Sequence, residues 1–142
     1  MTRPNVELAR RVLDLAGRGD LAGLVEIIGP GFELHENVLA PDAAVYRGPE
    51  GLKKWLESAL EAFAGFRFEA ERFLERGDWV FAEVHAHGRG RGSGAPFDAR
   101  YVTAFKFQLG KAVFAASYQD LPEALQAAGL PEEGAQESAE AT

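Results

Sequence analysis

The spacing of apolar residues predicts helices early in the chain and strands in its second half. Three stretches carry apolar residues three or four positions apart, and a polar capping residue, glycine or proline marks their ends. These predicted helices cover residues 6–16, 21–28 and 49–63. Five stretches alternate in strand fashion, at least in part. These predicted strands cover residues 32–38, 66–74, 79–87, 97–108 and 112–119. Residues 40–48 are predicted to form a loop, and Asp120 with Glu123 predicts a capped last helix over 121–128.

This order of elements predicts an α+β fold, because helices come first and strands then follow one another directly. We expect a curved, cone-shaped antiparallel sheet, covered on one face by the N-terminal helices, with a pocket between the two layers. A length of 142 residues suits one domain, which we place at residues 1–130. Residues 131–142 (PEEGAQESAEAT) hold no large apolar residue and are predicted to form an acidic disordered tail.

The charge is unevenly distributed along the chain. The net charge is −7, from 15 basic and 22 acidic residues. All the basic residues lie at or before Lys111 and six acidic residues follow it, so the body carries 16 acids against 15 bases. The segment Gly88–Gly92 (GRGRG) resembles an RNA-binding glycine–arginine stretch, but a single copy between two strands favours a hairpin bend. We therefore predict no nucleic-acid partner.

The composition excludes several other classes of protein. The chain contains no cysteine, which rules out disulfides, thiolate metal sites and thiol nucleophiles. No apolar run approaches the roughly 20 residues of a membrane span, and the N-terminus lacks the apolar segment of a signal peptide. We expect a cytoplasmic protein without a membrane partner.

Glu36 is the leading candidate for a catalytic group. Strand alternation places it on the same face as Leu34, toward the predicted pocket. A carboxylate among apolar walls has its pKa raised, which suits a general base. The alternative is that Glu36 pairs with an arginine or reaches solvent at the end of its strand.

The same alternation identifies further pocket residues. Tyr101, Thr103, Ser117 and Gln119 share the inward side of the last two predicted strands and supply polar groups. We expect the remaining lining to be apolar and to include Val12, Leu34, Trp55, Val84 and Phe105. A few polar groups in an apolar pocket are typical of a site for a small hydrophobic molecule, and no cofactor is required.

The predicted strand 79–87 carries a polar trio on its other face. Glu83, His85 and His87 alternate with apolar residues that must meet the core, so the trio points to the outer surface of the sheet. We favour a polar sheet face through which two copies of the chain form a homodimer. A zinc or iron site formed by the trio is the less favoured alternative.

The chain resembles the nuclear transport factor 2-like superfamily, and within it the SnoaL-like branch that includes polyketide cyclases and relatives of ketosteroid isomerase. The segments that carry this resemblance, which spans residues 5–130, are Arg18–Leu24, Phe32–Glu36, Tyr46–Leu52, Gly110–Lys111 and Tyr118–Asp120. It implies a cone-shaped fold around a pocket. The superfamily includes isomerases, cyclases, epoxide hydrolases, dehydratases and non-catalytic binding modules.

The catalytic positions of these relatives match only in part. The general base of ketosteroid isomerases falls on Glu36, whereas the tyrosine and the second acid of that enzyme fall on Val12 and Thr103. The acid–arginine–acid set of epoxide hydrolases is matched by Arg100 alone. The cyclase aspartate falls nearest to Asp120, which also suits a helix cap.

We therefore predict a protein that binds a small hydrophobic or polyketide-like ligand. Glu36 would act as general base for isomerisation, cyclisation or hydration, with Thr103 or Tyr101 positioning an oxygen atom of the substrate. The alternative is a non-catalytic ligand-binding or dimerisation module.

Overall fold

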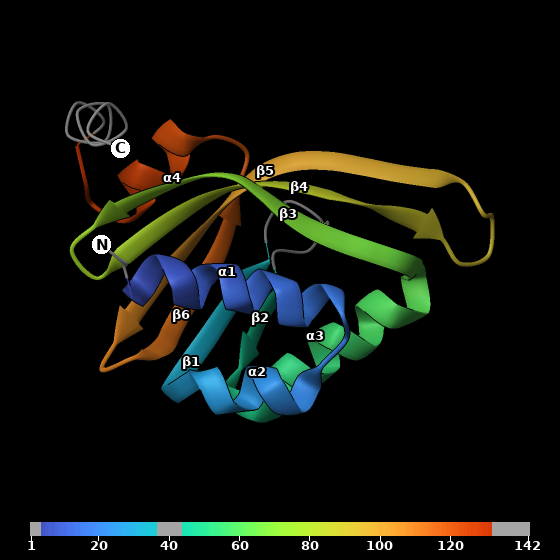
Figure 1. Ribbon diagram of the computed structural model, residues 1–142, viewed down its shortest axis with the longest axis horizontal. Helices are drawn as coiled ribbons and strands as arrows, with labels where there is room; N and C mark the ends of the chain where they lie inside the picture. Colours follow the sequence, from blue (N-terminus) through green and yellow to red (C-terminus); the bar gives the residue numbers. More distant parts are fainter. Residues whose placement is uncertain (1–3, 37–43, 132–142) are drawn as a thin grey trace.

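The computed structural model describes residues 4–36 and 44–131, which form six strands and four helices (Figure 1). The elements are α1 (Pro4–Gly17), α2 (Leu21–Ile27), β1 (Ile28–Glu36), β2 (Ala44–Arg47), α3 (Gly48–Ala62), β3 (Phe63–Arg76), β4 (Trp79–Gly90), β5 (Pro96–Gln108), β6 (Lys111–Tyr118) and α4 (Leu121–Ala127). The α+β prediction is confirmed. Most of the predicted tail, and residues 40–43 of the predicted loop, lie outside the described residues.

The six strands form a single sheet in the order β2-β1-β6-β5-β4-β3. The hairpins β3–β4, β4–β5 and β5–β6 are antiparallel, and so is β1–β2. The pair β1–β6 departs from the expected antiparallel sheet, because its strands are parallel. These two strands lie far apart in sequence, so no tight turn dictates their relative direction.

Strand β2 was not expected from the sequence, which predicted a loop there. It is only four residues long, too short for a recognisable alternation. Its partner defines it: Leu34 of β1 faces Tyr46, and Glu33 faces Arg47. Tertiary pairing rather than local pattern makes this segment a strand.

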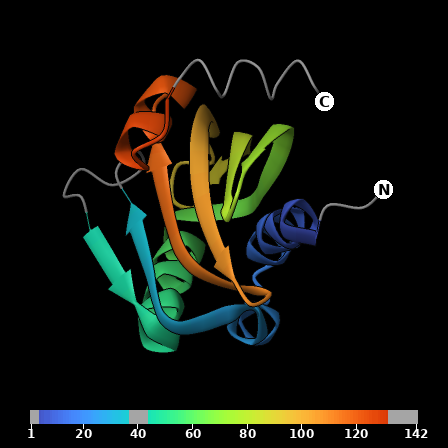
Figure 2. The same cartoon turned by 90° about the vertical axis from the view of Figure 1, so that its left-hand side faces the viewer.

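The sheet curves around α1, α2 and α3, while α4 packs on its opposite face (Figures 1 and 2). The larger core lies on the concave side and joins residues of these three helices to Val80, Val84 and Phe105. A smaller core on the convex side joins Leu125 of α4 to Phe81 of β4 and to residues of β3 and β5. Strand β4 is therefore buried on both faces at residues 80–82, near its start, and β5 at residues 101–105, near its middle.

The glycine–arginine segment stabilises a hairpin, as the bend prediction requires. Strand β4 runs on to Gly90, slightly further than its pattern indicates. The Arg91 guanidinium donates hydrogen bonds to the carbonyl oxygens of Leu60, at 2.7 Å, and Phe63, at 3.3 Å. The Arg89 guanidinium donates to the carbonyl of Gly94 at 3.1 Å. These arginines tie the β4–β5 turn to itself and to the end of α3.

Two aspartates cap helices as their positions predict. The Asp20 carboxylate accepts a hydrogen bond from the N–H of Gly23, and that of Asp120 accepts one from the N–H of Glu123, both at 2.9 Å. In the described part of the chain, no helix has the length and apolarity needed to cross a membrane.

Candidate functional site

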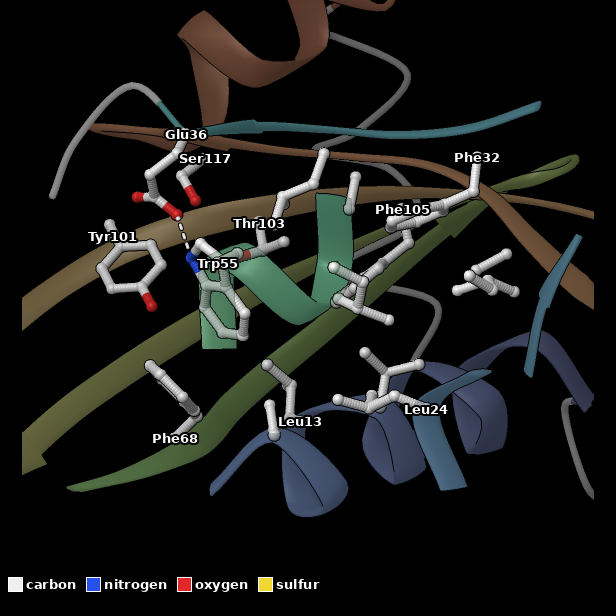
Figure 3. A pocket seen from close by; sticks show the side chains of 17 residues that line it. Leu13, Leu24, Phe32, Glu36, Trp55, Phe68, Tyr101, Thr103, Phe105 and Ser117 are labelled. Carbon is white, nitrogen blue, oxygen red and sulfur yellow. Dashed lines mark hydrogen bonds between the residues drawn. The ribbon is translucent and has the colours of Figure 1, made fainter. Parts of the chain in front are cut away.

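A cavity of about 70 Å³ lies between the concave face of the sheet and helices α1, α2 and α3 (Figure 3). Its walls are mostly aliphatic and aromatic side chains, with a few polar groups among them. The lining residues are Val12, Leu13, Ala16, Leu24, Ile28, Phe32, Leu34, Glu36, Leu52, Trp55, Phe68, Tyr101, Thr103, Phe105, Ala112, Ala115 and Ser117.

Glu36 places a carboxylate in this apolar cavity. Phe32, Leu34 and Glu36 point inward at alternate positions along β1. Glu36 is the last residue of the strand and is buried, with 5% of its surface exposed. The indole Nε1–H of Trp55, from α3, donates a hydrogen bond to Oε2 of Glu36 at 3.2 Å (Figure 3). Strand alternation and helix α3 together hold the carboxylate inside the molecule, so it does not reach solvent at the strand end.

Three hydroxyl groups share the cavity with Glu36. Thr103 and Ser117 face each other across β5 and β6, and both are buried. Tyr101 lies two residues before Thr103 on the same face and is 6% exposed. Burial raises the pKa of Tyr101 far above its usual value, and the nearby charge of Glu36 raises it further. The phenol therefore keeps its proton through the neutral and mildly alkaline range.

The polar groups are concentrated in one part of the cavity. In Figure 3, Glu36, Ser117 and Tyr101 lie on one side, and Leu24 and Phe32 on the other. This arrangement can hold the reactive oxygen of a ligand near the carboxylate while apolar walls enclose the rest.

A second hollow of about 180 Å³ adjoins the cavity on the far side of Trp55. Glu36, Trp55 and Phe68 line both spaces. The outer groove is rich in aromatic rings, and its other lining residues include Tyr46, Phe63, Phe66 and Phe97. The carboxylate of Glu36 thus stands where the two spaces meet.

Most of the residues predicted for the pocket line it. Those that do are Val12, Leu34, Glu36, Trp55, Tyr101, Thr103, Phe105 and Ser117. Their chemical roles stay predictions.

Val84 and Gln119, which were also expected in the pocket, do not line this cavity. Val84 points to the concave side opposite Tyr101, but it is packed in the core against the helices rather than facing the cavity. Gln119 lies beyond the end of β6, where strand alternation no longer applies. It is exposed, and its backbone N–H donates to Glu123 Oε1 at 3.0 Å.

Several lining residues were missed by the sequence analysis. They are Leu13 and Ala16 of α1, Leu24 of α2, Ile28 and Phe32 of β1, Leu52 of α3, Phe68 of β3, and Ala112 and Ala115 of β6. All of these residues are apolar, and apolar residues at regular spacing predict burial. No local signal separates a residue that lines a cavity from one that packs against a neighbour.

The other candidate residues lie away from the cavity. Arg100 is exposed and pairs with Glu71 at 3.1 Å, and Asp120 caps α4. His35 points away from the cavity and contacts Glu33 at 2.9 Å. Glu83 forms an ion pair with Arg72 at 2.9 Å. Of the predicted trio on the outer face, Glu83 is therefore paired with Arg72 of β3 rather than with His85 or His87.

The comparisons with known proteins agree on the fold. The model of the SnoaL-like domain matches residues 9–115, and no curated protein matches the sequence. A hypothetical protein with a ketosteroid isomerase-like fold from Catenulispora acidiphila, in complex with trimethylamine, superposes with a TM-score of 0.73 at 16% identity, covering 89% of this chain and 95% of its own. A putative SnoaL-like polyketide cyclase from Jannaschia gives a TM-score of 0.72 at 23% identity, covering 92% and 99%.

A nuclear transport factor 2-like protein of unknown function from Burkholderia pseudomallei is also similar, with a TM-score of 0.73 at 17% identity over 88% of this chain and 97% of its own. At these identities the solved structures establish the fold alone. The family match covers most of the chain, from within α1 to within β6, and includes α2, α3 and strands β1 to β5. The chain belongs to the SnoaL-like domain family.

Proposed function

We propose that this protein binds a small hydrophobic or polyketide-like molecule in the cavity and that Glu36 acts on it as a general base. One observation carries the proposal: a buried carboxylate, 5% exposed, lies inside a cavity whose walls are mostly apolar. Burying a carboxylate costs free energy, and buried carboxylates beside a cavity are concentrated at functional sites. The Trp55 N–H, at 3.2 Å, sets the direction of one carboxylate oxygen.

The proposed chemistry begins with proton abstraction next to a carbonyl group. Glu36 takes the proton from the α-carbon, and the electron pair of the C–H bond moves into an enolate. The hydroxyl of Tyr101 or Thr103 donates a hydrogen bond to the enolate oxygen. Because the pKa of Tyr101 is raised, its phenol is a proton-bearing donor at neutral pH. Return of the proton from Glu36 to another carbon gives isomerisation. Attack of the enolate carbon on a second carbonyl group of the ligand breaks its C–O π bond and gives cyclisation, with the proton of Glu36 passing to the new alkoxide.

The shape of the two spaces supports an apolar, partly aromatic ligand. The inner cavity of about 70 Å³ accepts a small ring or chain, and the outer groove of about 180 Å³ accepts a longer extension. Aromatic rings of Trp55 and Phe68 border both spaces, so a planar ligand could stack as it passes Glu36.

The test is exchange of hydrogen for deuterium at the α-carbons of cyclohexanone in D₂O, followed by NMR. We expect the wild-type protein to accelerate exchange above the buffer rate. E36Q should lose about 100-fold or more of that acceleration, as removal of a general base does. E33Q is the matched control, because Glu33 lies on the same strand but faces outward toward His35 and Arg47. Equal rates for E36Q and wild type would refute the role of Glu36.

A non-catalytic binding module is the second candidate. The relative from Catenulispora acidiphila holds trimethylamine, and here a carboxylate stands beside aromatic rings that suit a small alkylammonium ion. Binding can be followed separately, because the chain has two tryptophans and Trp55 lines the cavity whereas Trp79 does not. In a W79F variant, quenching by trimethylammonium or by cyclohexanone reports on Trp55 alone. Quenching without exchange would favour binding over catalysis. If quenching and exchange are both absent, both candidate functions are overturned.

A further inference from the structure

Two histidines and two carboxylates gather on the convex face of the sheet, away from the cavity. His85 and His87 point outward from β4, and their ring centroids are 5.0 Å apart. Glu69 on β3 is in register with His85, and Asp98 on β5 is in register with His87. Three neighbouring strands thus contribute side chains to one small area of the surface, with the strands themselves held in place by the sheet.

Three residues of this cluster bring ligand atoms close enough for one ion. A carboxylate oxygen of Glu69 and one ring nitrogen each of His85 and His87 all lie within 4.8 Å of one another. Glu69 Oε1 is 2.6 Å from His87 Nε2, and Asp98 Oδ2 is 2.8 Å from His85 Nε2. Tetrahedral zinc with bonds of about 2.0–2.1 Å needs ligand atoms roughly 3.3 Å apart. Rotations of these partly exposed side chains would bring the ligand atoms to that spacing.

The hydrogen bonding of the cluster also suits a cation. Each Nε2 atom that faces a carboxylate oxygen must carry a proton to make the observed contact. A divalent ion can replace these two protons, because it binds both nitrogens and both carboxylates at once. Two arginines on this face already have acidic partners: Arg100 pairs with Glu71, and Arg72 pairs with Glu83. The cluster therefore presents two carboxylates to a cation.

We propose that Glu69, His85 and His87 bind one divalent transition-metal ion of the zinc class, and that Asp98, which contacts His85 at 2.8 Å, turns toward the ion as its fourth ligand. Imidazole nitrogens with carboxylate oxygens in a tetrahedral arrangement select zinc over magnesium or calcium, which prefer all-oxygen sites. The ion would join β3, β4 and β5 on the face opposite the cavity. This site is independent of Glu36, and it uses Glu69 and Asp98 in place of Glu83, the acid of the predicted trio.

The test is titration of the untagged protein with zinc chloride in a calorimeter, with metal content measured after gel filtration. We expect one zinc ion per chain. The H85Q/H87Q double variant should bind at least tenfold more weakly. H35Q is the matched control, since His35 lies on β1 with a carboxylate partner of its own, and it should bind as wild type does. E36Q should also bind zinc normally, which separates this proposal from the proposed function.

A second measurement covers the case in which the double variant does not fold. The chain has three histidines, so each can be followed by NMR in wild-type protein labelled with ¹⁵N at histidine. Zinc should shift the ring signals of His85 and His87 and leave those of His35 in place. Absence of retained zinc, equal binding by the double variant, or shifts spread over all three histidines would overturn the proposal.

Discussion

Each polar side chain in the cavity has an identifiable position on the fold. Glu36 follows Phe32 and Leu34 as the third buried position of β1 and accepts a hydrogen bond from the indole N–H of Trp55. Thr103 and Ser117 come from paired positions on β5 and β6. Alternation along a strand could predict all three, since it depends only on neighbouring residues. The contact with Trp55 could not be predicted, because it depends on how α3 packs against β1.

Tyr101 gives a prediction about stability at high pH. Its pKa is raised in the folded protein, first by burial and then by Glu36, whereas an unfolded tyrosine ionises near pH 10. Above about pH 10 the unfolded chain therefore releases this proton before the folded chain does. Wild type should lose about 1.4 kcal/mol of stability per pH unit in that range relative to Y101F, with no such difference between pH 7 and 9.

Urea unfolding of wild type and Y101F at pH 7, 9 and 11 measures this effect. The comparison is internal, because both proteins share every other titrating group. Parallel loss of stability in the two proteins between pH 9 and 11 would show that Tyr101 is not the group responsible.

At the scale of elements, the contact between β2 and α3 is unusually close. Gly51 in the first turns of α3 is buried, and a Cβ atom there would lie 2.7 Å from the backbone carbonyl carbon of Tyr46. Real Cβ atoms do not approach a backbone atom so closely, so a side chain at position 51 would push the helix from the strand. Tyr46 and Trp55, one on each of these elements, both line the outer groove.

The G51A variant should therefore be less stable, although alanine favours helices over glycine by about 1 kcal/mol. Overpacking of this kind typically costs about 1–3 kcal/mol, so we expect a net loss in urea unfolding. E57A on the exposed side of the same helix is the control and should change stability by less than about 0.5 kcal/mol. A G51A protein more stable than wild type would show that helix propensity outweighs the contact.

For the whole molecule, the C-terminal residues carry much of the net charge. Four glutamates lie within residues 131–142, so removing this segment changes the net charge from −7 to −3. The segment contains no large apolar residue to bury. A chain ending at Leu130 should melt within about 2 °C of the full-length protein, since α4 and its cap are retained. A much larger fall in the melting temperature would show that these residues contribute to the fold.

The homodimer proposed for the outer sheet face is tested by light scattering. The convex face carries the polar side chains Arg72, Glu83, His85, His87 and Arg100, several of them already paired with one another or with neighbours. We expect a mass near twice the 15.4 kDa of one chain at micromolar concentration. A monomer would contradict the dimer and would leave the proposed zinc site unaffected.

Apolar spacing along the chain was enough to predict the class of the fold and the inward side of β1, β5 and β6 near the cavity, because it depends on neighbours a few residues apart. It also placed Glu36 and Thr103 on faces that meet the cavity. Only the tertiary structure decided the remaining features: that β2 exists, that β1 and β6 run parallel, and that Val84 is covered. The tertiary structure also places Glu69 beside His85 and His87, whereas Glu83, the acid of the predicted trio, pairs with Arg72. These features depend on which distant segments become neighbours, and strand pairing across the sheet sets that rather than local pattern.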